Sequence, residues 1–187
     1  REAGAVVVFE PINQISRARN AGAARASGDW LIFVDADSHP TPELFADVVD
    51  VIQKGRCLAG GSTVCFENPD RAVAFVGGCW NRISRVTRWA AGSFIFCEAS
   101  AFRQAGGFSL ELYAAEEVDL FRRLKRVARR SGRTIEILHR HPLLTSDRKA
   151  RLYSPREGIT FVVRTLMQRG RTLRSPKECF QWYDGRR

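Results

Sequence analysis

Several features that would point to other kinds of protein are missing from this chain of 187 residues. Its apolar runs, such as 31–34 and 94–97, fall far short of the roughly 20 residues that a membrane-spanning helix needs. The chain contains a single methionine and opens instead on Arg-Glu-Ala-Gly. We therefore predict no membrane span, and we interpret the sequence as a fragment whose natural N-terminus is absent.

Paired cysteines are also missing. The five cysteines are odd in number, and none forms a CxxC pair. This pattern argues against a zinc site and against a disulfide framework. It favours buried free thiols in a reducing compartment, which predicts a cytoplasmic protein. The cysteines are Cys57, Cys65, Cys79, Cys97 and Cys179.

Acidic residues become scarce after the first 50 positions. Residues 1–50 hold 4 basic and 8 acidic side chains, residues 51–150 hold 17 and 9, and residues 151–187 hold 9 and 3, for a net charge of +10. A basic tail favours a nucleic acid, an anionic membrane surface or a phosphate-bearing substrate, or is simply a solvated surface. The absence of zinc-finger spacing and of basic–aromatic repeats argues against nucleic acid.

The first third of the chain alternates strand and helix signals. Residues 5–9 and 30–34 are apolar and predict strands, the second one central and covered on both faces. Residues 16–26 predict a helix, and a further helix is expected to run from a Thr41 N-cap to about residue 54. This order predicts an α/β fold with a mostly parallel sheet flanked by helices.

The remaining segments are assigned more coarsely. We expect strands at 57–66, interrupted by Gly60-Gly61, at 92–97 and at 134–138. Helices are expected at 99–105, 116–130 and 155–169, the second with a clear apolar stripe. Residues 70–88 are interpreted as a mobile or acceptor-facing segment. No linker marks a second domain, so we divide the chain into a domain at 1–150 and a basic helical extension at 151–187.

Two aspartates follow the strand expected at 30–34. Asp35 and Asp37 stand where a buried strand ends, which is where ligands bind in open α/β sheets. Their hard oxygen atoms suit Mg²⁺ or Mn²⁺, and such a cation would bind the oxygens of a diphosphate. An aspartate pair that merely caps the next helix is the alternative.

A second acidic group opens the helix expected at 116–130. Glu117 lies three residues before Leu120 and therefore points along the apolar stripe, toward the protein body. A carboxylate there suits a general base, although a simple helix-start charge pair has the same appearance. Arg19, on the first helix, has planar donors that suit a nucleotide phosphate or base.

Together these blocks resemble a family 2 glycosyltransferase of the GT-A fold. The resemblance rests on the run from Ser16 to Asp37 (SRARNAGAARASGDWLIFVDAD), then GGF at 106–108 and EEVDL at 116–120, and it covers residues 4–150. It implies a nucleotide-sugar donor (UDP-, GDP- or dTDP-linked), a divalent cation and inversion at the anomeric carbon. The first strand and loop of that family, whose aspartate grips the base, have no counterpart here.

The resemblance also implies roles for individual residues. Asp35 and Asp37 match the metal and diphosphate motif, Asp35 being donor-binding as well, and Glu117 matches the catalytic base, a position where the family usually has aspartate. Glu116 and Asp119 match its acidic neighbours. Arg19 and Gly92 match donor-side positions, Gly92 on a strand that lines the sugar site.

The tail adds weaker candidates. His141 is a candidate third metal ligand, and Ser146, Arg148 and Lys149 form a basic loop that could touch the diphosphate. The helix at 155–169 could lie on an anionic bilayer and present a lipid-linked acceptor. Two other functions remain open: a nucleotidyltransferase, and a non-catalytic binding module with the same fold.

Overall fold

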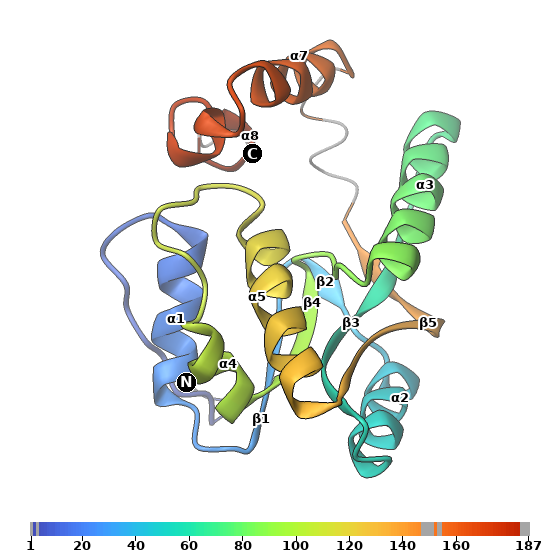
Figure 1. Ribbon diagram of the computed structural model, residues 1–187. Helices are drawn as coiled ribbons and strands as arrows, with labels where there is room; N and C mark the ends of the chain where they lie inside the picture. Colours follow the sequence, from blue (N-terminus) through green and yellow to red (C-terminus); the bar gives the residue numbers. More distant parts are fainter. Residues whose placement is uncertain (1, 3, 147–151, 153–154, 184–187) are drawn as a thin grey trace.

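The computed structural model describes residues 2, 4–146, 152 and 155–183. Their strands form one five-stranded sheet in the order β1-β4-β3-β5-β2, with helices packed around it (Figure 1). The strands are β1 (Trp30–Val34), β2 (Ser38–His39), β3 (Cys57–Phe66), β4 (Phe94–Glu98) and β5 (Thr134–Thr145). The helices are α1 (Ile15–Arg25), α2 (Pro42–Gln53), α3 (Arg71–Thr87), α4 (Ala99–Ala105), α5 (Glu116–Ser131), α7 (Pro155–Met167), α8 (Phe180–Tyr183) and the 3₁₀ turn η1 (Arg171–Arg174).

The sheet confirms the α/β class but corrects the expected strand directions. Among the strands that the structure describes, only β3 and β5 are parallel neighbours. β4 runs antiparallel to both β1 and β3, and β2 runs antiparallel to β5. The sheet is therefore mixed, as suits a GT-A-like domain, rather than mostly parallel. The difference arises because β4 inserts between β1 and β3 with the opposite direction.

Two expectations about the N-terminal region are wrong. Residues 5–9 form no strand, and Val6 and Phe9 are 74% and 86% exposed. Their β-branched composition favours a strand only where a neighbouring strand supplies hydrogen bonds. β1 is an edge strand rather than a central one, and its Ile32 and Val34 are partly exposed, so it is not covered on both faces.

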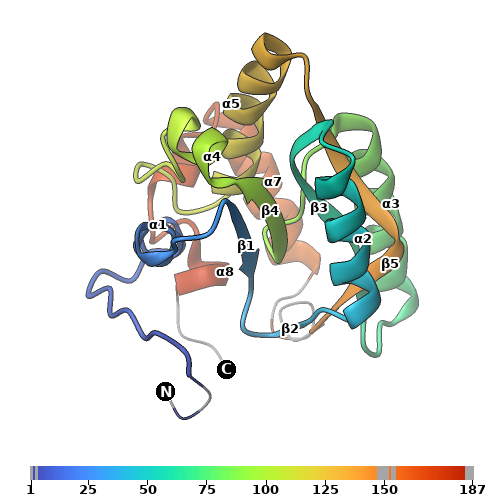
Figure 2. The ribbon, with the colours of Figure 1, turned by 90° about the horizontal axis from the view of Figure 1, so that it is seen from below.

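Two apolar cores lie on opposite faces of the sheet. Side chains alternate along β4, so that Ile95 packs with α4 and α5 while Phe96 packs with α2. Figure 2 shows α4 and α5 on one side of the strands and α2 on the other. The α5 stripe contributes Leu120, Phe121 and Leu124, all fully buried, as its periodicity predicts.

β3 is continuous through its two glycines, contrary to the interruption expected there. A Cβ at Gly60 would lie 2.3 Å from the Glu136 carbonyl oxygen, and one at Gly61 would lie 2.3 Å from the Ala90 Cβ. These glycines therefore permit close approach of neighbouring segments. The parallel β5 is longer than expected, because a bulge that contains Pro142 lets the strand resume and reach residue 145.

Residues 71–87 form helix α3, in the segment that was expected to be mobile or acceptor-facing. Asp70 caps α3 by accepting a hydrogen bond from the Val73 amide at 2.8 Å. Asn81 then fixes the helix to β3, since its side chain bonds both the amide and the carbonyl of Val64. The remaining helices agree with their predicted ranges, including the Thr41 cap of α2.

The cysteines divide into two groups. Cys57, Cys97 and Cys179 are buried, as expected, and burial raises the pKa of the Cys57 thiol to about 11. Cys65 and Cys79 are exposed, which corrects the prediction for these two. None of the helices in the described ranges is both long and apolar enough to cross a bilayer.

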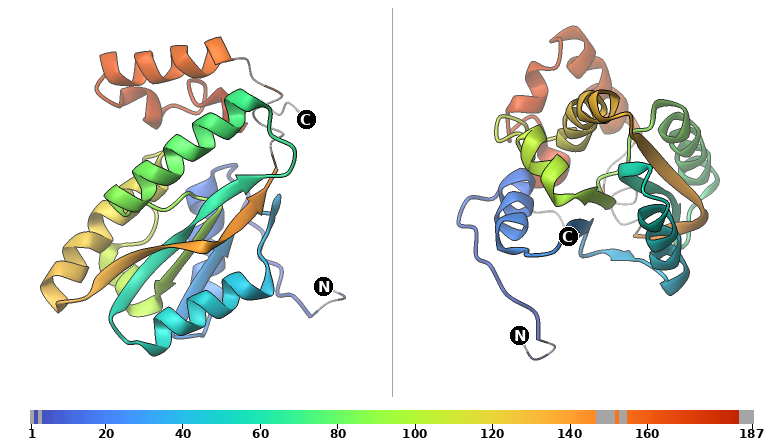
Figure 3. Two further views of the ribbon diagram at one scale, coloured as in Figure 1. Left: turned by 90° about the vertical axis from the view of Figure 1, so that its right-hand side faces the viewer. Right: turned by 60° about the horizontal axis from the view of Figure 1, so that its bottom comes forward.

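The C-terminal residues return to the sheet domain. The Tyr113 amide donates to the Leu173 carbonyl at 2.7 Å, and the Ile15 amide donates to the Tyr183 hydroxyl at 3.3 Å. The rings of Tyr113 and Tyr183 meet edge to face, with centroids 5.4 Å apart. In the left view of Figure 3, α7 and the turns after it lie at the top, above α3 and α5.

Candidate active site

Arg19 joins the two acidic motifs of the chain. It lies in the middle of α1, and its guanidinium donates to Asp35 Oδ1 at 2.7 Å and to Glu116 Oε1 at 3.0 Å. The same group donates to the Gly92 carbonyl at 2.8 Å and stacks 5.2 Å from the centroid of the Phe108 ring. The turn after β1 and the start of α5 are therefore brought together, so that the two acidic motifs lie near each other.

The two glutamates that open α5 have different surroundings. Glu116 is buried, with 6% of its side chain exposed, and is neutralised by Arg19. Glu117 is half-buried, and desolvation, assisted by the nearby Glu116 carboxylate, raises its pKa to about 7. Glu117 can thus hold or release a proton near neutral pH, which suits a general base.

Gly92 holds these groups close together. It lies in a turn before β4, not on the strand itself as expected. A Cβ at Gly92 would be 3.3 Å from Arg19 Nη2 and 3.7 Å from Glu117 Cδ. The neighbouring Ser93 carbonyl accepts the Asp35 amide at 3.1 Å. A side chain at this position would require the Arg19 guanidinium to move by a few tenths of an ångström, whereas its distance to Glu117 is an ordinary van der Waals contact.

Ser93 also carries a buried polar atom at this position. Its hydroxyl has no hydrogen-bond partner among the residues that the structure describes. Buried hydroxyl groups are normally paired with protein or water. An unsatisfied oxygen beside the aspartate motif and the glutamate motif is consistent with a polar ligand at this site.

Asn20 positions the loop that leads to α5. Its amide nitrogen donates to the Phe108 carbonyl and its amide oxygen accepts from the Phe108 amide, both at 2.9 Å. Gly107 adopts a φ of +67°, and a Cβ there would lie 2.9 Å from Asn20 Oδ1. The Gly106-Gly107-Phe108 motif is therefore held against α1. Sequence reasoning missed this role, although asparagine inside a helix has a low intrinsic propensity and could have drawn attention to it.

Asp119 lies one turn into α5 and pairs with Arg123 at 2.7 Å. Arg123 also donates to the Gly107 carbonyl at 2.6 Å and to the Ala105 carbonyl. The predicted catalytic neighbour Asp119 therefore orients an arginine that binds the glycine loop. Its observed contacts are those of a positioning residue.

A groove extends from this cluster along the open edge of β1. It has a volume of about 570 Å³ and lies between α1 and β1, with Arg19 and Asp35 at one end. The remaining lining is mostly apolar, from Ala23 of α1 and Ile32 of β1 among others. A cleft of this size with charged groups at one end is typical of a small-molecule site.

The aspartates fit a cation that shares its coordination with a substrate. Asp35 uses one carboxylate oxygen for Arg19 and remains 38% exposed, and Asp37 follows two residues later in the same turn. Mg²⁺ commonly takes one or two carboxylates together with phosphate oxygens and water. A cluster of three or more His, Cys, Asp or Glu able to hold a metal is not found in the described part of the chain. Asp35 and Asp37 supply the carboxylate oxygens at this site that could hold such a cation.

His141, the candidate third metal ligand, is paired outside this cluster. His141 lies on β5 and its Nδ1 is 3.0 Å from Asp47 of α2. Ser146 donates its amide to the Asp37 carbonyl at 3.1 Å, so the end of β5 does reach the aspartate turn. Arg148 and Lys149 lie outside the described residues.

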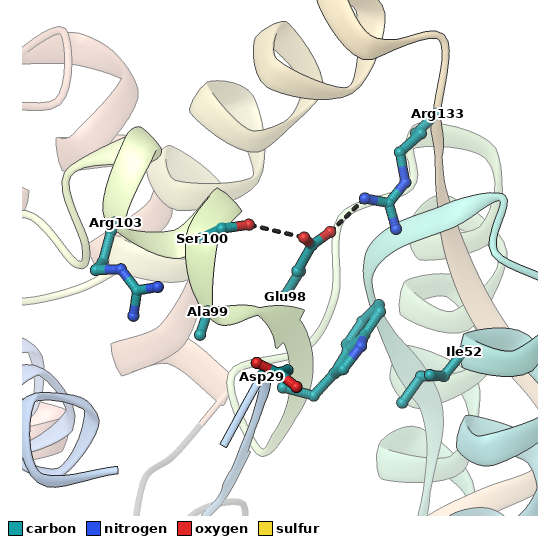
Figure 4. Close-up of a pocket in the computed structure, with 8 residues that line it drawn as sticks. Asp29, Ile52, Glu98, Ala99, Ser100, Arg103 and Arg133 are labelled. Atoms are coloured by element: carbon teal, nitrogen blue, oxygen red, sulfur yellow. Dashed lines mark hydrogen bonds and ion pairs between the residues drawn. The ribbon is translucent and has the colours of Figure 1, made fainter. Parts of the chain in front are cut away.

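A smaller cavity lies at the other end of the sheet. It has a volume of about 250 Å³ and is lined by Asp29, Arg103 and Arg133 among others. Figure 4 shows the Glu98 carboxylate between the Ser100 hydroxyl, at 2.7 Å, and the Arg133 guanidinium. This cavity contains neither the aspartates that follow β1 nor the glutamates that open α5, so we do not assign it as the candidate site.

Comparison with known families identifies the domain. The model of the family described as glycosyl transferase family 2 matches residues 1–105, more than half of the chain. The chain belongs to this family. Its family membership implies a nucleotide-sugar donor and an acceptor, and the matched region includes Arg19, Asp35, Asp37 and Gly92. No match was found among curated proteins.

Proposed function

We propose that this family 2 glycosyltransferase is an inverting, cation-dependent enzyme. It moves a sugar from a UDP-, GDP- or dTDP-linked donor to an acceptor hydroxyl or phosphate. The observation that carries the proposal is the Arg19 bridge, which joins Asp35 to Glu116 and leaves Glu117 beside them. The proposal assigns metal and diphosphate binding to Asp35 and Asp37.

The reaction would be a direct displacement at the anomeric carbon. The acceptor oxygen forms the new bond to that carbon as the bond to the diphosphate breaks, and the nucleoside diphosphate leaves with the electron pair. Glu117 takes the proton of an attacking hydroxyl, for which its raised pKa of about 7 is suited. A bound Mn²⁺ or Mg²⁺ would supply stabilisation of the negative charge on the leaving group.

Arg19 would contribute in two ways. Its contact with Glu116 keeps a positive charge between the two acidic motifs, which limits their repulsion of a diphosphate. Its contacts with Gly92 and Phe108 fix the guanidinium before any substrate arrives. A preorganised charge of this kind stabilises a departing diphosphate without reorganisation during the reaction.

Two organisational proposals accompany this function. We assign residues 1–150 to the catalytic domain and 151–187 to an extension that packs on it through Leu173 and Tyr183. For the acceptor, α7 with its exposed Val163 and Leu166 would lie on an anionic bilayer that holds a lipid-linked substrate.

The test is a transfer assay with radiolabelled sugar nucleotides. We expect release of nucleoside diphosphate that requires Mn²⁺ or Mg²⁺ and is lost in Asp37→Ala. A parallel thermal-shift panel of UDP-, GDP- and dTDP-sugars should show stabilisation only with the cation, and none in Asp37→Ala. Binding of sugar nucleotides without any turnover would instead support a non-catalytic module, and pyrophosphate release from a nucleoside triphosphate would support a nucleotidyltransferase.

A further inference from the structure

Helix α3 packs on the sheet through one side and exposes apolar residues on the opposite side. One side packs on β3 through Gly77, Asn81 and Ser84, of which Gly77 and Ser84 are buried. The opposite side carries an exposed stripe, in which Phe75 is 73% and Val86 is 81% exposed. The exposed α3 stripe comprises Phe75, Val76, Cys79, Ile83 and Val86.

The spacing of these residues places them on one face. Positions 75, 79, 83 and 86 recur at intervals of three and four residues, and position 76 lies beside them on a helical turn. The helix has 17 residues, which corresponds to a length of about 25 Å. An exposed apolar face of this length is unusual for a helix whose other side is already packed on its own sheet.

The charges beside the stripe all have one sign. Residues 71–88 contain four arginines and no aspartate or glutamate. Arg71, Arg82, Arg85 and Arg88 are all exposed. By contrast, α2 also exposes a valine, Val49, but carries Glu43, Asp47 and Asp50. α3 therefore differs from α2 in combining an exposed apolar stripe with arginines alone.

Further cations gather where α3 ends. Lys125 of α5 donates to the Thr87 carbonyl, and its ammonium lies 5.2 Å from the centroid of the Trp89 ring. Arg122 stacks on the same ring at 5.5 Å. Burial lowers the pKa of Lys125, and the charges of Arg129, Arg88 and Arg122 lower it further, which shows how closely these cations are grouped.

We propose that α3 is a membrane-binding helix that lies in the surface of a bilayer rich in anionic phospholipids. The exposed α3 stripe enters the boundary between headgroups and acyl chains, and the flanking arginines contact lipid phosphates. Figure 1 shows α3 projecting beyond the sheet, so that its outer side can approach a flat surface. The inference is independent of the proposed reaction, because it concerns a surface outside the Arg19 cluster.

Charge also argues against a second copy of the chain as the occupant. An antiparallel pairing of two α3 helices would bring arginines of both copies together without an acidic residue from either helix. Like charges at that distance repel each other. An anionic lipid surface instead offers an opposite charge to every arginine of the helix.

The test is co-sedimentation of the chain with vesicles of pure phosphatidylcholine or of phosphatidylcholine with phosphatidylglycerol. We expect binding to the anionic vesicles only, weakened at high salt. The double variant Phe75→Ser/Val86→Ser should weaken binding by about tenfold or more. Arg82→Ala/Arg85→Ala should also weaken it and reduce its salt dependence.

Two controls make the result specific. Val49→Ser on the acidic α2 should leave vesicle binding unchanged. The α7 variant Val163→Ser/Met167→Ser removes exposed apolar groups from the helix that is proposed above to lie on the same surface, and it should weaken binding less than the α3 double variant does. Circular dichroism and thermal melting confirm that each variant folds.

Three outcomes would overturn the proposal. The first is absence of binding to anionic vesicles by the unmodified chain. The second is binding that survives the α3 double variant and disappears in the α7 variant. The third is a concentration-dependent dimer that the α3 variant abolishes while vesicle binding is absent. Sugar transfer can succeed or fail independently of all three.

Discussion

The guanidinium of Arg19 is shared between Asp35, at 2.7 Å, and Glu116, at 3.0 Å. These three residues come from α1, from the turn after β1 and from the start of α5, so one cation fixes three elements at once. With 11% of the Arg19 side chain and 6% of the Glu116 side chain exposed, this pair is largely shielded from water. Its loss should therefore affect folding as well as catalysis.

Replacing Arg19 with alanine tests this structural role. The substitution leaves the buried Glu116 carboxylate without a counter-charge, which costs about 3–5 kcal/mol of stability. Arg19→Lys should be intermediate, because one ammonium group cannot reproduce the planar fork. Urea denaturation measures both effects.

Arg25→Ala is the matched control for these variants, since Arg25 is exposed at the end of the same helix. Its free energy of unfolding should change by no more than about 1 kcal/mol. Equal losses for Arg19→Ala and Arg25→Ala would contradict the role given to the bridge.

The pH dependence of sugar transfer follows from Glu117. A general base must be ionised, and the pKa of Glu117 is raised to about 7. With an acceptor hydroxyl, kcat/KM should therefore rise about tenfold per pH unit below 7 and level off above it. A rate that is constant from pH 5 to pH 8 would exclude Glu117 as the base in its present environment.

The free energy of unfolding should fall with rising pH because of the same residue, Glu117. The folded state keeps the Glu117 proton up to about pH 7, whereas the unfolded chain loses it near the ordinary value of 4.5. Between these two pH values the folded state binds more protons, so its stability falls as the pH rises. Glu117→Gln should remove this loss, and at pH 8 it should be more stable than the unmodified chain by on the order of 2 kcal/mol while transferring no sugar. Thermal melts of both proteins at pH 5 and pH 8 measure the difference.

Much of the candidate site could be predicted from local patterns. The aspartates at the end of β1 and the glutamates at the start of α5 are both marked by a change from apolar to acidic residues, which a sequence displays directly. What joins them is not local. The Arg19 bridge spans 97 positions to Glu116, and no spacing rule predicts which arginine of a basic chain makes such a contact.

The fold was less predictable where partners decide the structure. Residues 5–9 have strand composition and yet form no strand, because no neighbour supplies hydrogen bonds. The direction of β4 depends on its insertion between β1 and β3, which the order of elements alone does not specify. The α3 helix was missed because Gly77 and Gly78, which have low helix propensity, lie in its middle, although the structure has Gly77 packed against Phe66 of β3.

Asn20 provides a test of how the glycine motif is held. Its side chain satisfies both the amide and the carbonyl of Phe108 at 2.9 Å. Asn20→Leu should leave both groups unpaired and cost about 2–4 kcal/mol, with a fall in transfer rate because the loop leads directly to α5. The exposed Asn13→Ala is the control and should be nearly neutral. A fully stable Asn20→Leu variant would show that water replaces the side chain at Phe108.

The glycines of β3 and α3 make a matched pair for the last prediction. A Cβ at Gly60 would lie 2.3 Å from both the Glu136 carbonyl oxygen and Phe96 Cζ, whereas a Cβ at Gly78 meets nothing within 4 Å. Gly60→Ala must push β3 away from β5 and should cost about 2–3 kcal/mol or more. Gly78→Ala should instead stabilise α3 by about 0.5–1 kcal/mol, since alanine loses less backbone entropy in a helix. Chemical denaturation measures the free energy of unfolding of both variants. Equal changes would mean that β3 and β5 are packed less closely than the contact of Gly60 with Glu136 indicates.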